Sequence, residues 1–130
     1  MSMPFAGGAV IYAKNTRTIS SFYAEIAGLQ VTHAEHDHVV LEAGAFQLVI
    51  VALPAQLAAA IHVATPALPR EDTAIKLVLP VASLAIARQM APALGGQLKP
   101  PEREWQFQGT RVCDGHDPEG NVLQFRECAL

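Results

Sequence analysis

The sequence predicts an α+β domain of two modules, each built as strand, helix and then three strands. Three observations lead to this class. Apolar residues recur at helical spacing near 19–26 and 84–94, each such stripe follows a strand-like run, and each ends at glycine. The two strand-to-glycine segments have almost the same length, which indicates a weak internal repeat. Finally, Asp117-Pro-Glu-Gly-Asn121 is a turn between two alternating strands.

The first module spans about residues 5–53 and begins with a strand at Ala9–Ala13. Asn15 or Thr16 can cap the following helix, and Gly28 can end it. Four apolar residues form the helix stripe at i, i+3, i+4 and i+7: Ile19, Phe22, Tyr23 and Ile26. We therefore expect this helix to pack one face against a sheet.

Gly44-Ala45 is the expected turn between the third and fourth strands of this module. If the turn has two residues, Glu42 lies opposite Gln47 and His38 lies opposite Val51. The first module therefore closes with an antiparallel hairpin of defined register.

A linker with a short helix is expected at about residues 54–72. Pro54 suits the first position of a helix, and strong helix formers follow it up to Ile61. Pro66 and Pro69 then predict an irregular stretch.

The second module spans about residues 73–128 and begins with a strand at Ile75–Leu79. Ser83 can cap its helix, and Pro92 should kink the helix or end it early. The turn at Asp117–Asn121 closes the last hairpin.

Strand periodicity sorts the side chains into two faces. One parity is apolar and must lie under the helices: Ala9, Ile11, Val39, Leu41, Leu48, Ile50, Ile75, Leu77, Leu79, Leu123 and Phe125. The other parity, which we call the mixed face, carries polar residues among valines: Gly8, Val10, Tyr12, His38, Glu42, Gln47, Val49, Val51, Ala74, Lys76, Val78, Val122, Gln124 and Arg126. Such a face is either open to solvent or the wall of a ligand cavity.

Two features of the second module suggest what a ligand would be. Trp105 and Phe107 alternate with Gln106 and suit stacking on a flat organic molecule, although a core edge looks the same. Lys76 and Arg126 would place two cations on the mixed face, which favours an anionic ligand if both tips point inward.

The turn at Asp117–Asn121, followed by Gln124, resembles the closing hairpin of the vicinal oxygen chelate superfamily, which includes glyoxalase I, extradiol dioxygenases and bleomycin resistance proteins. Ile11-Tyr-Ala-Lys-Asn15, Phe22-Tyr23 and Gly28-Leu29 resemble the family's opening strand, helix and second strand. The resemblance covers nearly the whole chain. It implies one domain of two βαβββ modules whose curled sheets enclose a ligand site, and a homodimer.

The resemblance also implies where a metal ion would bind, at the positions of Gly8, Val49, Ala74 and Gln124. Glycine, valine and alanine have no donor side chain, and one neutral amide oxygen cannot hold a divalent ion that needs three or four ligands. We therefore expect no metal at this site and no other cofactor.

The run His33-Ala-Glu-His36-Asp-His38 is the only histidine cluster in the sequence. His36 and His38 could point the same way on a strand and share an ion, but a polar run at a turn is more typical of a solvated loop. Cys113 and His116 are the potential nucleophile and base that lie nearest each other in the sequence. No oxyanion-hole motif or positioned third group accompanies them, so a catalytic role is not favoured.

Composition limits the partners and the compartment. A net charge of −3 without a basic stripe argues against nucleic acid, and no apolar stretch is long enough to span a membrane. No signal peptide is evident, and two cysteines in a chain of 130 residues are typical of reduced thiols, so we expect a cytoplasmic protein.

These observations predict a metal-free protein, similar to the bleomycin-resistance branch, that binds a small organic ligand. Its expected ligand residues are Tyr12, Gln47, Lys76, Trp105, Gln124 and Arg126. One alternative is a lyase, isomerase or dioxygenase-like enzyme with a non-standard metal site, or with His38 and Glu42 as proton carriers. Another is a structural or protein-interaction module.

Overall fold

The computed structural model describes residues 5–128, and it divides into two compact units at His62/Val63. The first unit contains module one and the short helix of the linker. The second contains the rest of the linker and module two.

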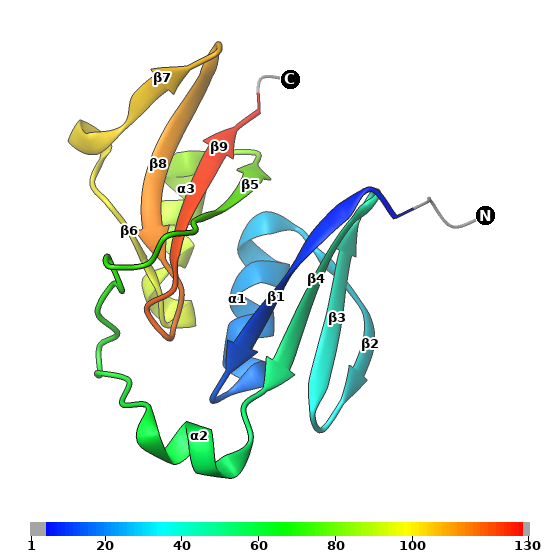
Figure 1. The fold of residues 1–130 in the computed structure, drawn as a ribbon. Coiled ribbons are helices and arrows are strands. Elements are labelled where there is room, and N and C mark those ends of the chain that lie inside the picture. The colour runs from blue at the N-terminus through cyan, green and yellow to red at the C-terminus, as the bar shows by residue number, and fades with distance from the viewer. Residues whose placement is uncertain (1–4, 129–130) are drawn as a thin grey trace. The chain divides into compact units, whose positions relative to one another are not determined.

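Module one is a four-stranded sheet with one helix on its apolar face (Figure 1). The strand order is β1-β4-β3-β2, with β1 parallel to β4 and the other neighbours antiparallel. Its elements are β1 (Gly7–Ala13), α1 (Thr16–Ala27), β2 (Gln30–Glu35), β3 (His38–Ala43) and β4 (Phe46–Ala52). The predicted order of one strand, one helix and three strands is confirmed.

Module two repeats this topology with the order β5-β9-β8-β6, and a further strand, β7, also pairs with β8. Strand β5 is parallel to β9, as β1 is to β4. Its elements are β5 (Leu77–Val81), α3 (Leu84–Met90), the 3₁₀ turns η1 (Pro92–Leu94) and η2 (Pro101–Arg103), β6 (Gln97–Leu98), β7 (Trp105–Phe107), β8 (Thr110–His116) and β9 (Val122–Glu127).

The second strand of module two is broken where module one has a continuous one. β6 and β7 both pair with β8, and Pro100-Pro101 separates them. Proline has no amide hydrogen to donate to a ladder, so a strand cannot continue through this pair. Arg88 of α3 holds the interruption in place by donating to the Lys99 carbonyl at 2.9 Å and by pairing with Glu104.

Helix α1 follows its predicted boundaries. The Asn15 side chain accepts hydrogen bonds from the amides of Arg17 and Thr18 at 3.1 and 3.0 Å, and Gly28 ends the helix with φ +70°. Only a residue that tolerates a left-handed backbone suits such a stop. The four stripe residues are all buried: Ile19, Phe22, Tyr23 and Ile26.

Helix α3 is short, as Pro92 predicts. Ser83 caps it by accepting from the Ile86 amide at 3.2 Å, and the Glu127 carboxylate of β9 accepts from the Leu84 amide at 2.9 Å. The chain tightens into η1 at Pro92 and ends at Gly95 with φ +91°.

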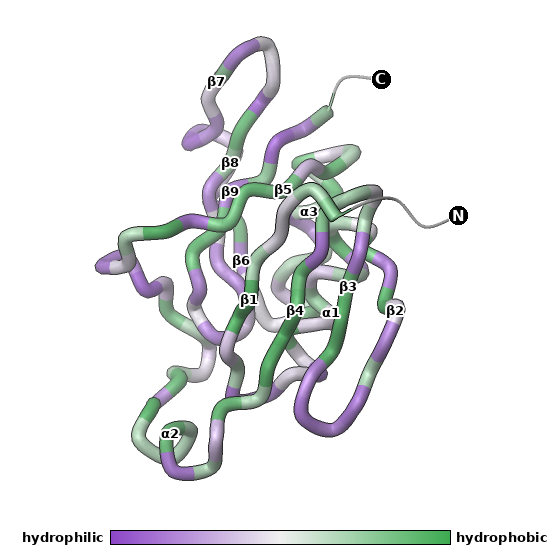
Figure 2. The backbone as a smooth tube through the Cα atoms, turned by 45° about the vertical axis from the view of Figure 1, so that its right-hand side comes forward, coloured by the Kyte–Doolittle hydropathy of each residue, from purple (hydrophilic) through white to green (hydrophobic). Residues whose placement is uncertain are grey.

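The predicted hairpin register is confirmed, with Glu42 opposite Gln47 and His38 opposite Val51. The apolar parity is also confirmed for six fully or nearly fully buried residues: Leu41, Leu48, Ile50, Leu79, Leu123 and Phe125. Figure 2 shows β4 as mainly hydrophobic and the turn between β2 and β3 as hydrophilic.

Ile75 is a correction to the predicted core. It was assigned to a strand beginning at residue 75, but β5 begins at Leu77, and the Ile75 side chain is 85% exposed. The segment before β5 lacks ladder partners, so strand parity does not determine which way its side chains face.

The linker contains the predicted short helix, α2 (Ala55–Ala60), although Pro54 lies just before its first residue rather than within it. Within residues 5–128, no helix is both long and apolar enough to cross a membrane.

Candidate functional site

The mixed face of module two contains a cavity of about 540 Å³. This volume lies within the range of roughly 300–1,000 Å³ that small-molecule sites occupy. The walls come from the end of the linker, the segment 73–76 before β5, β6 with the two residues after it, β8 and β9. The lining residues are Pro69, Glu71, Thr73, Ala74, Ile75, Lys76, Gln97, Leu98, Lys99, Pro100, Asp114, Gly115, His116 and Val122.

The turn at Asp117–Asn121 holds in place the part of the cavity wall that the linker forms, which we call the linker wall. The buried Asp117 carboxylate accepts hydrogen bonds from the amides of Glu119 and Asn121 at 2.9 and 3.0 Å, which fixes the turn. The Gly120 carbonyl accepts from the Arg70 amide at 2.7 Å. A Cβ on Gly120, whose φ is +82°, would lie 2.1 Å from the Leu68 carbonyl oxygen, so only glycine permits this contact.

Charged groups line the cavity in pairs. Lys76 Nζ lies 3.1 Å from Asp114 Oδ1, and Lys99 Nζ lies 3.8 Å from Glu71 Oε1. His116, 9% exposed, contributes a buried imidazole. The cavity therefore offers both cationic and anionic groups beside apolar surface.

Three predicted ligand residues lie on the sheet of module two but not in the cavity wall. Gln124 Oε1 accepts a hydrogen bond from Arg126 Nε at 2.9 Å, and the Arg126 guanidinium stacks 4.7 Å above the centre of the Phe107 ring. Trp105 lies on β7 opposite Val112 of β8 and is 39% exposed. Of the predicted set, only Lys76 lines the cavity.

Tyr12 and Gln47 belong to module one, on β1 and β4. Tyr12 is 63% exposed, and Gln47 is opposite Glu42. Glu42 accepts a hydrogen bond from the Thr32 hydroxyl at 2.7 Å. His38 lies at the other end of β3, so the two predicted proton carriers are about 13 Å apart along the strand.

The positions that the resemblance matches to metal ligands have other roles here. A Cβ on Gly8 would lie 2.1 Å from the Gln47 carbonyl oxygen, so the backbone approach leaves no space for a ligating side chain. Val49 and Ala74 carry no donor atom. The one donor, Gln124 Oε1, already accepts from a guanidinium, and that positive charge repels a metal ion.

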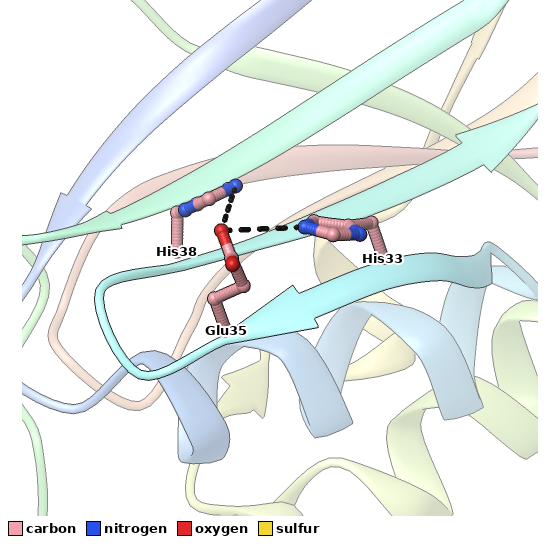
Figure 3. A group of neighbouring side chains, drawn as sticks. All are labelled: His33, Glu35 and His38. Carbon is pink, nitrogen blue, oxygen red and sulfur yellow. Dashed lines mark ion pairs between the residues drawn. The ribbon is translucent and has the colours of Figure 1, made fainter.

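Three of the histidines, His33, His36 and His38, lie on the β2–β3 hairpin. The sequence left open whether His36 and His38 share a face and an ion or belong to a solvated loop, and His36 lies in the turn between β2 and β3. His33, Glu35 and His38 come together instead (Figure 3). A hydrogen bond with His38 lowers the pKa of the neighbouring Asp37 carboxyl.

Cys113 and His116 face opposite sides of β8, since they are three residues apart on one strand. Burial raises the pKa of the Cys113 thiol against the opposing effect of Arg88, and Cys113 Sγ donates to the Lys99 carbonyl at 3.3 Å. Cys113 is therefore a protonated core residue and not a nucleophile. Both cysteines are free, Cys113 buried and Cys128 exposed.

Sequence reasoning missed several residues of the cavity. Asp114 and His116 were within reach, because the turn register places Asp114 opposite Gln124 and His116 opposite Val122. Glu71 gave no such signal, because the linker carries no periodic pattern that would place it against the sheet. Lys99 gave none either, because β6 has only two residues and ends just before it.

Comparison with known proteins agrees with this architecture. The profile of the Glyoxalase-like domain family matches residues 8–125. No curated protein matches the sequence. A glyoxalase/bleomycin resistance protein/dioxygenase family enzyme from Burkholderia phytofirmans PsJN superposes with a TM-score of 0.69 at 18% identity, over 94% of this chain and 97% of that one.

Two further similar structures contain bound ligands. A bleomycin-binding protein complexed with bleomycin gives a TM-score of 0.57 at 17% identity, over 94% of this chain and 97% of that one. A fosfomycin resistance protein from Listeria monocytogenes, complexed with Mn(II) and a dihydroxypropylphosphonic acid, gives 0.64 at 14% identity, over 95% and 89%. At such identities the likeness shows the fold alone. With its family profile, strand order and closing hairpin, the chain belongs to the glyoxalase-like domain family of the vicinal oxygen chelate superfamily.

Proposed function

We propose that the protein binds a small organic molecule in the cavity of module two, without a metal ion at the four family positions. The observation that carries this proposal is the cavity of about 540 Å³, whose linker wall is held by the turn at Asp117–Asn121. A surface that merely faced solvent would need no such attachment. The bleomycin-binding relative of the same fold is consistent with a binding role.

The donor set supports the metal-free part of the proposal. Gly8 has no space for a side chain, Val49 and Ala74 have no donor, and Gln124 faces Arg126. Gln124→Glu would restore a carboxylate but would also create an ion pair with Arg126. We expect this variant to gain no zinc or manganese affinity at that position.

The proposal also concerns the charge of the ligand. Lys76 and Lys99 each have a carboxylate nearby, so an anionic ligand would compete with Asp114 and Glu71 for these ammonium groups. We propose a ligand with one acidic group that displaces Asp114 from Lys76. Trp105, Gln124 and Arg126, together with Tyr12 and Gln47, remain predicted ligand residues.

Anilinonaphthalene sulfonate, an anionic aromatic probe, tests the cavity directly. Ala74→Trp would place a large side chain at the cavity wall, and we expect it to weaken probe binding at least about tenfold. Ala60→Trp, on the exposed helix α2, is the matched control and should bind normally. Unchanged probe affinity in Ala74→Trp would contradict the proposed site. Lys76→Met removes a cationic group of the cavity wall, and it should weaken binding of this anionic probe.

The assembly and the compartment are also proposals. We propose a homodimer, because Val10 and Tyr12 expose 54% and 63% of their surface on one strand of the mixed face. Light scattering that gives a monomer at micromolar concentration would contradict it. We propose a cytoplasmic location from the free thiols, and a fluorescent fusion in the source cell would check this.

A further inference from the structure

The β2–β3 hairpin of module one gathers three metal-binding side chains outside the cavity and outside the family's metal positions. The ligand atoms of His33, Glu35 and His38 all lie within 4.8 Å of one another (Figure 3). Glu35 Oε2 lies 3.4 Å from His33 Nε2 and 3.6 Å from His38 Nε2. Two imidazoles and one carboxylate form a ligand set that zinc uses when a further position stays open.

The spacing of these atoms suits coordination of one metal ion better than direct hydrogen bonds between the side chains. Both distances from the Glu35 oxygen exceed a normal N–H···O hydrogen bond of roughly 2.7–3.2 Å. In a tetrahedral zinc site with bonds of about 2.0–2.1 Å, neighbouring ligand atoms are roughly 3.3–3.4 Å apart. The carboxylate oxygen therefore lies at coordination spacing from both imidazoles.

Asp37 orients His38 for this role. His38 Nδ1 lies 2.8 Å from Asp37 Oδ1, and an ionised carboxylate can only accept, so Nδ1 must donate. In the neutral ring the lone pair is then on Nε2, the atom nearest Glu35. Metal-bound histidines commonly have such a carboxylate on their second nitrogen.

A β-bulge at Thr32 determines which face of the sheet His33 occupies. Val31 is opposite Leu41, yet His33, two residues on, is opposite Val40. Residues two apart normally share a face, but the extra residue of a bulge reverses this. His33 therefore faces away from the core side and joins Glu35, which is opposite His38.

We propose that His33, Glu35 and His38 bind a divalent transition-metal ion, with zinc as the reference ion. The side chains of His33 and Glu35 are 56% and 54% exposed, so at least one coordination position stays open to water or a small ligand. The site lies wholly within module one, whereas the organic-ligand cavity lies wholly within the unit that contains module two.

Calorimetric titration of the untagged full chain with zinc chloride at about pH 7.5 tests the proposal. We expect one ion per chain. His33→Gln and His38→Gln should each weaken binding at least about tenfold, and Asp37→Asn should weaken it roughly tenfold. His36→Gln is the matched control: it is the same substitution, in the adjacent turn, and it should leave zinc affinity unchanged.

Cobalt(II) gives a second readout that does not depend on affinity alone. Four-coordinate cobalt bound by the hairpin should show visible absorption bands that disappear in His38→Gln and persist in His36→Gln. Absence of zinc binding by the natural chain would overturn the proposal. An equal loss of affinity in His36→Gln and His38→Gln would do so too, because it would indicate general histidine binding.

Discussion

Module one and module two have the same strand order, yet they use the mixed face of the sheet differently. In module one β2 is continuous, and β1 exposes Val10 and Tyr12. In module two the matching strand is broken at Pro100-Pro101, and linker residues line a cavity over the sheet. Topology therefore supplies a surface, whereas the covering segment and its attachment make a cavity.

The largest expected effect comes from Gly120→Ala, which would break the attachment. The new Cβ would meet the Leu68 carbonyl oxygen at 2.1 Å, and φ is +82°. We expect a loss of about 2–4 kcal/mol in the free energy of unfolding, measured by urea denaturation, and loss of anilinonaphthalene sulfonate binding.

Gly109→Ala is the matched control for this change. Its φ is +80°, but a Cβ there would meet nothing within 4 Å, so it should cost only about 1 kcal/mol and leave probe binding intact. Equal losses in the two variants would mean that backbone strain, and not the linker contact, determines the effect at Gly120.

A smaller effect is expected at Gly8→Ala in module one. Its Cβ would meet the Gln47 carbonyl oxygen at 2.1 Å and push β1 away from β4, at a cost of about 1–3 kcal/mol. Gly7→Ala, with nothing within 4 Å, should be nearly neutral. Thermal unfolding of both variants measures the difference, and a neutral Gly8→Ala would show that the family metal position can take a side chain after all.

The smallest expected effect is a pH dependence that belongs to module two, which contains both cysteines. Burial raises the pKa of Cys113 in the folded protein, so above the ordinary thiol pKa the unfolded chain loses this proton first. Stability should therefore fall as pH rises above about 8.5, by at most about 1.4 kcal/mol per pH unit for one thiol.

Urea denaturation from about pH 7.5 to pH 10 measures this slope, with Cys113→Ala as the reference. The variant should be less stable at neutral pH because the lost sulfur leaves a void in the core. Its stability should nevertheless decline less steeply as pH rises. If the stability of the natural chain and of the variant falls equally with pH, Cys113 is not the cause.

Much of the fold was predictable because local signals determine it. Asn15 and Gly28 bound α1, Ser83 and Pro92 bound α3, and the Gly44-Ala45 turn sets the register of β3 and β4. Such signals act within a few residues, so a single sequence contains them.

The candidate site was less predictable because it depends on distant contacts. Glu71 reaches Lys99, and Arg70 reaches Gly120, through a linker without periodic pattern. The same absence of pattern left Ile75 misplaced. The bulge at Thr32 also has no composition signal, and alternation counted from Val31 without it would place His33 on the core side.

The bulge has one more consequence, for transfer of the hairpin to other proteins. Beyond the bulge, segment 33–40 keeps a regular register, and it contains the three clustered side chains, the turn and the carboxylate that orients His38. Deleting Thr32 would leave Val31 and His33 on alternate faces of a regular strand, so the cluster does not depend on the irregularity beside it. We therefore expect segment 33–40 to keep the cluster when it is grafted onto another two-residue hairpin.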